Sequence, residues 1–254
     1  MTQPHHIPLR ELYVSDAAAS ALAAEAEKLP GWTLDAVQAG ELTLLMTGGF
    51  APLRGYMSES DWRAVQDGAV QPWPVPLALN VGADFPDNVQ PGDDIALRDK
   101  EGEVLAVMSV TDRWLADGEV RLGGKVKGLR RPAGETPNSL RALSRDRGCE
   151  RVLAVQPGHA DQIAAAARLA RQMEAALLVQ PLPGVAVEAP PEAIIAPLPV
   201  VPPHGPRALL WQGLVARNHG ATHVVLGGDA AAQDLYRRHQ DEIGARMVVP
   251  DGIL

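Results

Sequence analysis

Three side chains that can hold an anion surround one turn in the second half of the chain. Residues 151–162 read RVLAVQPGHADQ, which places Gln156, His159 and Gln162 around a Pro-Gly turn. The turn lies between the buried run 152–156 and an alanine-rich segment with helical spacing that extends to residue 176. Because the first N–H groups of a helix have no partner within the helix, this strand-turn-helix order favours binding of sulfate or phosphate.

A second turn with the same surroundings follows residues 222–226, an apolar run that predicts another buried strand. The residues after it are Gly227, Gly228 and Asp229, and a helix is predicted over 230–243. Doubly wound parallel sheets place ligand sites where neighbouring loops diverge at the carboxyl edge. We therefore predict one cleft that is lined by Gln156, His159, Gly227, Gly228 and Asp229.

Longer motifs carry a resemblance to a known family. Residues 48–57 read GGFAPLRGYM, residues 122–129 read LGGKVKGL, and residues 136–141 read TPNSLR. These segments resemble the ATP sulfurylase (sulfate adenylyltransferase) family, whose members join sulfate to ATP and release pyrophosphate. The resemblance extends along most of the chain. A purely structural interpretation of the first motif is that its glycines adopt positive φ angles and that Phe50, Leu53, Tyr56 and Met57 form core.

The resemblance assigns roles to the first turn and shows how much of it has changed. Family members carry Gln-x-Arg-Asn followed by His-x-x-His there, residues that hold sulfate and the ATP phosphates. Gln156 and His159 match two of these positions, Gln162 replaces the second histidine, and the Arg-Asn pair has no counterpart. His159 and Gln162 are therefore expected to be vestiges of catalytic residues. For His159 alone, a surface or helix-capping role is the alternative.

The other two site motifs of the family have also lost their cations. Pro202 takes the place of an arginine, while Gly228 and Ala230 replace the arginine and histidine of Gly-Arg-Asp-His. We expect ATP with magnesium to be the cofactor if any nucleotide binds, and we predict no bound metal site. Compensating charge would have to come from Arg207 or Arg217, and helical spacing places Arg217 on a solvated face.

The spacing of apolar residues predicts two domains. Residues 74–120 consist of short apolar segments between turn residues, which indicates a β-barrel, and the resemblance implies that this barrel is PUA-like. Strands and helices alternate after the Pro/Gly-containing join near residue 132, which indicates a doubly wound parallel sheet. We expect a PUA-like domain over 1–134 and a Rossmann-like nucleotidyltransferase domain over 135–254. Single helices are predicted over 11–29 and 36–46.

Composition excludes several classes of partner. The chain of 254 residues has a net charge of −8, which argues against nucleic acid and anionic membranes as partners. Residues 1–10 lack the apolar core of a signal peptide, so we expect a cytoplasmic protein. We expect its single cysteine, Cys149, to be a packing residue at the entrance of a strand.

The retained glycines and prolines, together with the lost cations, predict a degenerate member of the family with little or no activity. The resemblance implies a structural or regulatory role for an adenylylsulfate kinase domain, in cis or in trans, because some bacterial members are fused to one. A homo-oligomer is also expected. Since family members continue beyond residues 250–254, the chain is expected to be truncated. The alternatives are an active ATP sulfurylase with a rebuilt site and a nucleotide-binding module without chemistry.

Overall fold

A computed structural model describes residues 8–71, 73–82 and 85–249 of the chain. The described residues form two compact units, one of which is Arg10–Ala133. The other consists of the described residues before Arg10 together with those from Gly134 onwards. Leu9 belongs to this second unit because its backbone exchanges hydrogen bonds of 2.8 and 2.9 Å with the side-chain amide of Asn138. Residues 250–254, on which the expectation of a truncated chain depends, lie outside the described residues.

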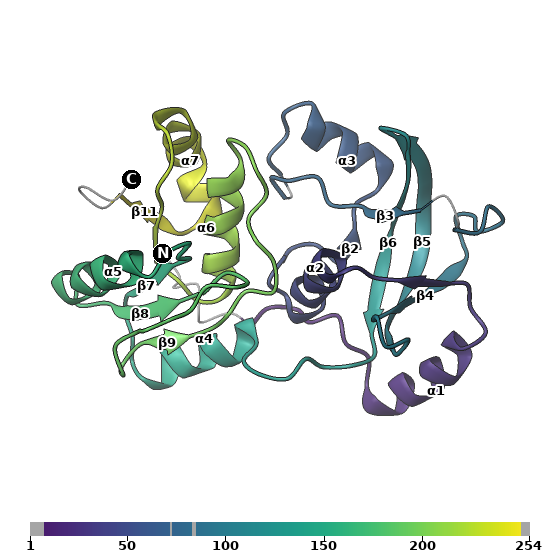
Figure 1. Cartoon of the computed structure of the whole chain (residues 1–254), viewed down its shortest axis with the longest axis horizontal. Coiled ribbons are helices and arrows are strands. Elements are labelled where there is room, and N and C mark those ends of the chain that lie inside the picture. Colours follow the sequence, from purple (N-terminus) through teal and green to yellow (C-terminus); the bar gives the residue numbers. More distant parts are fainter. Residues whose placement is uncertain (1–7, 72, 83–84, 250–254) are drawn as a thin grey trace. The chain divides into compact units, whose positions relative to one another are not determined.

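The first unit contains a six-stranded sheet in the order β1-β4-β5-β6-β2, with β3 also paired to β6. Its long β5–β6 hairpin appears in teal in Figure 1. The pairs other than β1–β4 are antiparallel, as in the alternating pattern of the sequence. The elements are α1 (Asp16–Ala26), β1 (Gly31–Thr33), α2 (Ala36–Thr47), β2 (Gly55–Tyr56), α3 (Glu59–Gln66), β3 (Leu79–Val81), β4 (Asp94–Arg98), β5 (Val104–Ala116) and β6 (Glu119–Gly128).

Two N-terminal predictions have different outcomes. Helix α2 begins at residue 36 as predicted, because Asp35 and Gln38 form a capping box. Helix α1 is shorter than the predicted 11–29, because Ser15 accepts a hydrogen bond from Ala18 N and caps the helix at residue 16. Leu12 lies outside the helix in extended chain, where its N–H bonds to Met46 O and its carbonyl accepts from Gly128 N.

The second unit contains a parallel five-stranded sheet in the order β11-β10-β7-β8-β9. The chain starts in the middle at β7, moves outward through β8 and β9, and returns to the other side of β7 for β10 and β11 (Figure 1). This order confirms the predicted doubly wound sheet. Its elements are α4 (Pro137–Asp146), β7 (Val152–Val155), α5 (Asp161–Gln172), β8 (Ala176–Val179), β9 (Ile194–Ile195), α6 (Ala208–Asn218), β10 (His223–Val225), α7 (Ala230–Ile243) and β11 (Arg246–Val248).

The core of the second unit explains why β7 has a continuous apolar sequence. All four residues of β7 are buried, because β8 and β10 flank the strand and α5 packs against it. Leu153 and Val155 contact a cluster that includes Ile163 and Ala166 from α5. The strand and the helix after it are therefore held firmly, and so is the turn that joins them.

Candidate functional site

The two predicted turns leave neighbouring strands at the same edge of the sheet. Strands β7 and β10 pair in parallel, with Val225 opposite Val155. The segments that follow β7 and β10 therefore leave the sheet side by side at its carboxyl edge. The strand order reverses between these two strands, which is where doubly wound folds bind ligands. A cavity of about 320 Å³ lies at this point.

The cavity brings together four of the six residues singled out in the sequence. Gln156, Gln162, Gly227 and Gly228 line it. His159 and Asp229 are exposed and are not part of its wall. Whether any of these residues binds a ligand stays a prediction, but their surroundings show what each side chain does in this structure.

The side chain of Gln162 accepts hydrogen bonds from backbone N–H groups of the turn that precedes helix α5. Its Oε1 accepts a hydrogen bond of 2.8 Å from Gly158 N and a longer one of 3.4 Å from His159 N. Both N–H groups belong to the turn just before Ala160, the N-cap residue of α5, which has no side-chain cap. The side-chain amide oxygen therefore occupies two backbone donors of this turn that an anion could otherwise bind.

Asp229 has the equivalent role at helix α7. It is the N-cap residue, and its Oδ1 accepts a 2.8 Å hydrogen bond from Ala232 N. A carboxylate at this position already interacts with the helix dipole and repels a second anion. The start of α7 and the turn before α5 thus each receive a side-chain oxygen from their own chain.

A buried group of amides forms the base of the cavity. Gln156 is 8% exposed and Gln180 is fully buried. Gln156 Nε2 donates to Gln180 Oε1 at 3.1 Å and to the carbonyl oxygen of Gln212 at 3.2 Å. Among the described residues, Gln156 Oε1 and Gln180 Nε2 have no hydrogen-bond partner. The cavity is therefore polar but neutral at its base.

Sequence reasoning did not include two of these glutamines in the site. Gln180 follows β8 directly, so its place at the carboxyl edge could have been inferred from the parallel pairing of β8 with β7. Gln212 lies inside α6 and contributes through its backbone carbonyl, which no sequence pattern identifies.

No Arg, Lys or His side chain is among the described residues that line the cavity. The prediction that Arg217 lies on a solvated helix face is wrong. Arg217 is partly buried, its Nη1 donates to Asn218 Oδ1 at 3.0 Å, and burial lowers its pKa. Arg141, which is 3% exposed, donates to the carbonyl oxygens of residues 217 and 218 at the end of α6. Burial and the nearby Arg217 lower the pKa of Arg141 to about 10.

The neighbouring histidine is held neutral in the same region. His219 is buried and its Nδ1 lies 2.7 Å from Val215 O, so Nδ1 carries the proton. Burial lowers the pKa of His219 to about 4, and the positive charge of Arg141 adds to this effect. Arg141 therefore binds the C-terminal backbone carbonyls of α6 and Arg217 binds the side chain of Asn218, and neither lines the cavity.

Comparison with known proteins places the chain in a family. Residues 2–129 match the PUA-like domain family, and the chain belongs to that family. The chain is also similar to the sulfate adenylyltransferase of Gibberella zeae, with 28% identity over 325 positions that cover 96% of this chain and 57% of the relative. The enzyme of the same name from Eremothecium gossypii is 27% identical, with coverage of 98% and 65%. These similarities confirm the predicted resemblance to ATP sulfurylases.

A solved structure also resembles the chain over nearly its whole length. The chain is similar to the structure described as hexameric APS kinase from Thiobacillus denitrificans, with a TM-score of 0.81 and 31% identity, over 98% of this chain and 56% of that one. The chain thus spans little more than half the length of this protein, and 57 to 65% of the two sulfate adenylyltransferases. The alignment with the Gibberella enzyme is also longer than the 254 residues available here, so the relative contains segments without a counterpart.

Two further properties of the described residues concern membrane-spanning helices and groups of metal ligands. None of its helices has the length and apolar character that crossing a membrane requires. Within residues 8–71, 73–82 and 85–249, no three His, Cys, Asp or Glu side chains are grouped in a way that could hold a metal ion.

Proposed function

We propose that this chain is an ATP sulfurylase homologue that no longer makes adenylylsulfate and that serves as a structural or regulatory domain for an adenylylsulfate kinase. The observation that carries this proposal is the uncharged lining of the cavity between β7 and β10. Sulfate and the ATP phosphates bring several negative charges into one site. Charge-assisted contacts to fixed cations normally offset such charges.

The described cavity does not fit a magnesium-bound triphosphate. Gln162 and Asp229 direct oxygens at the two helix entrances, and the amides of Gln156 and Gln180 are bonded to each other. Removal of one preorganised donor typically lowers turnover by about 10²- to 10³-fold. Loss of several donors from one site therefore supports an inactive enzyme more than one with a rebuilt site.

Nucleoside binding without chemistry is the second candidate function. The cavity of about 320 Å³ lies at the lower end of the range for small-molecule sites. Gln156 Oε1, at its base, has no hydrogen-bond partner among the described residues. This oxygen could accept a hydrogen bond from an uncharged ligand, so a base or ribose fits the lining better than phosphate does.

Adenylylsulfate kinase is proposed as the partner because almost the whole chain is similar to part of a structure described as a hexameric APS kinase. We further propose that this chain forms a homo-oligomer. A cytoplasmic location is proposed as well.

The partnership can be tested by mixing the purified chain with a separately produced adenylylsulfate kinase from the same organism. At about 20 μM of each, a common peak in size-exclusion chromatography with light scattering is expected, at a mass that includes both chains. Kinase kcat/KM should change by at least threefold in the mixture, while an unrelated acidic protein should leave it unchanged. Separate elution with unchanged kinetics would contradict a partnership in trans.

A further inference from the structure

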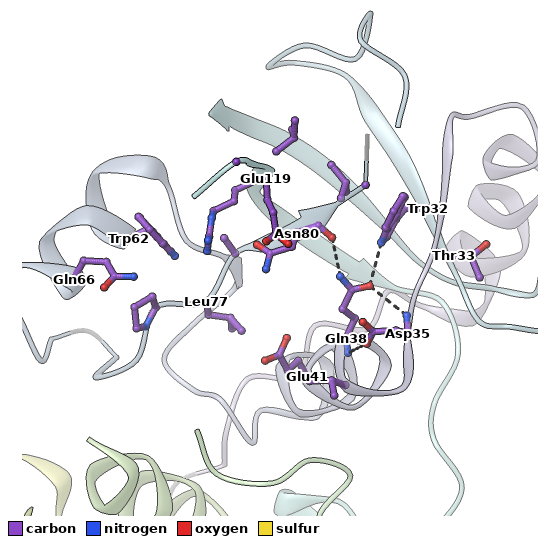
Figure 2. A pocket seen from close by; sticks show the side chains of 18 residues that line it. Trp32, Thr33, Asp35, Gln38, Glu41, Trp62, Gln66, Leu77, Asn80 and Glu119 are labelled. Carbon is purple, nitrogen blue, oxygen red and sulfur yellow. Dashed lines mark hydrogen bonds between the residues drawn. The ribbon is translucent and has the colours of Figure 1, made fainter. Parts of the chain in front are cut away.

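A second cavity lies within the PUA-like unit and has no part in the proposed function. It has a volume of about 810 Å³, and residues from β1, α2, α3, β3 and β6 line it (Figure 2). This volume is within the range of sites that enclose drug-sized or cofactor-sized molecules. The cavity lies entirely within residues 32–121, so a single unit builds it.

One wall of the cavity is fixed by Gln38, whose side-chain amide has three hydrogen bonds. Its Oε1 accepts from Trp32 Nε1 at 3.1 Å and from the backbone N–H of Asp35 at 3.2 Å. Its Nε2 donates to Asn80 O at 2.7 Å, and Figure 2 shows these bonds as dashed lines. Strand β1, helix α2 and strand β3 are thereby joined, so this wall exists before any ligand binds.

Arg121 is the only cationic side chain among the described residues that line the cavity, and it already has partners. Its Nη2 lies 2.8 Å from Asp117 Oδ2, and its guanidinium lies over the ring of Trp62 at 4.6 Å from the centroid. The guanidinium is therefore held at the wall, and its charge is offset by Asp117.

Three carboxyl groups line the same cavity as this single cation: Asp35, Glu41 and Glu119. Asp35 caps helix α2. Glu41 has no hydrogen bond or ion pair with any described residue, and Figure 2 shows its carboxyl group pointing into the space beside Leu77. Burial, together with the negative charge of Asp35, raises the pKa of Glu41 to about 7. A partly buried acid without a cation is costly to ionise, and a bound cation would remove that cost.

We propose that this cavity binds a small organic cation, with an ammonium or amidinium group at Glu41 and a flat apolar body against Trp32 and Leu77. The carboxylate supplies charge-assisted hydrogen bonds to the N–H groups of the ligand. The partial burial of Glu41 lowers the local dielectric and strengthens this pairing. Anions are disfavoured because the lining has an excess of carboxyl groups.

Binding should be coupled to ionisation of Glu41. The charged group that acts on Glu41 is Asp35 at the start of α2, and the buried Tyr56 of β2 interacts with both carboxyl groups. Glu119 and Arg121 from β6 line the same cavity. Tyr56 stays protonated because burial, and then Glu41 and Asp35, raise the pKa of its hydroxyl. Since a cation binds the ionised carboxylate, affinity should rise by about tenfold between pH 6 and pH 8.

The test uses the whole chain and three probes of equal size that differ in charge: 2-phenylethylamine, 2-phenylethanol and phenylacetate. Calorimetry at pH 8 should show binding of the amine at least tenfold tighter than that of the alcohol, and no binding of the acid. The Trp32 indole N–H signal in NMR spectra should shift with the amine. Glu41→Gln should lower amine affinity at least tenfold and remove its pH dependence, whereas Glu101→Gln, a change of the same charge in the exposed β4–β5 turn, should alter neither.

Several outcomes would overturn the proposal. These are equal affinity for amine and alcohol, tighter binding of phenylacetate, unchanged amine binding in Glu41→Gln, or no binding of the amine at about 10 mM. Folding is not a confounding factor for Glu41→Gln, because a neutral amide lacks the cost of ionising a buried carboxyl group. Circular dichroism of the variant should therefore match that of the parent chain.

Discussion

Incubated with ATP, magnesium and sulfate, the purified chain should release pyrophosphate at less than about 10⁻³ per second, whereas ordinary enzymes turn over at about one per second or faster. The physical reason is the absence of fixed cations in the cavity, which is lined by glutamines, glycines and aliphatic side chains. A coupled pyrophosphate assay, run beside a competent sulfate adenylyltransferase, measures this rate. Turnover at an ordinary rate would establish the rebuilt-site alternative.

Restoration of single charges should not recover this activity. Gly228 has a φ angle of +110°, so an arginine introduced by Gly228→Arg would strain the turn that it needs to serve. Asp229 and Gln162 would still occupy the helix entrances. The double variant Gly228→Arg with Ala230→His should therefore stay near background in the same assay, because sulfate and the reacting phosphate must be aligned together.

Replacement of Gly55 by alanine should destabilise the PUA-like unit by about 3–5 kcal/mol, a loss typical of changes at tightly packed backbone. Gly55 has a φ angle of +152°, and an added Cβ would collide with the carbonyl oxygen of Gly124 and lie 2.9 Å from Lys125 Cα. These atoms belong to the backbone of β6, which pairs with β2 at this point, so they cannot move aside without breaking the sheet. Urea unfolding, followed by circular dichroism, measures the loss.

Gly68→Ala is the matched control for this prediction. Gly68 also has a positive φ angle, +125°, but a Cβ there would meet nothing within 4 Å. Its replacement therefore introduces backbone strain without a collision, and the expected loss is about 1–2 kcal/mol. Equal losses in the two variants would show that the collision at Gly55 contributes little and that the close approach of β2 to β6 is tolerant.

Much of the fold could be predicted because periodicity and caps agreed with each other. The Thr136-Pro137 helix start, the strand over 176–179 and the helix over 230–243 appear in the structure where the sequence indicates them. The predicted helix over 11–29 was too long at both ends, because Ser15 caps the helix at residue 16 and the helix ends at residue 26. The competing extended conformation of Leu12 depends on hydrogen bonds to residues far along the chain, and a local pattern does not reveal those.

The site was harder to predict because its polar side chains form hydrogen bonds with backbone groups of nearby residues. Asp229 and Gln162 are residue types that bind ligands, but here Asp229 caps α7 and Gln162 bonds to the turn before α5. Arg217 has the spacing of an exposed residue, yet it is partly buried beside Arg141. No sequence motif indicates the cavity around Glu41, because the residues that line it come from five separate elements.

The measurement that tests the central claim most directly compares MgATP with adenosine in calorimetric titrations of the intact chain. If the cleft between β7 and β10 is neutral and its helix entrances are already satisfied, the phosphates add no affinity, and MgATP binds no more tightly than adenosine. A gain of tenfold or more for MgATP, which shrinks as salt is raised and disappears in Gln156→Leu, would show that the cleft still recognises phosphate and would contradict the account.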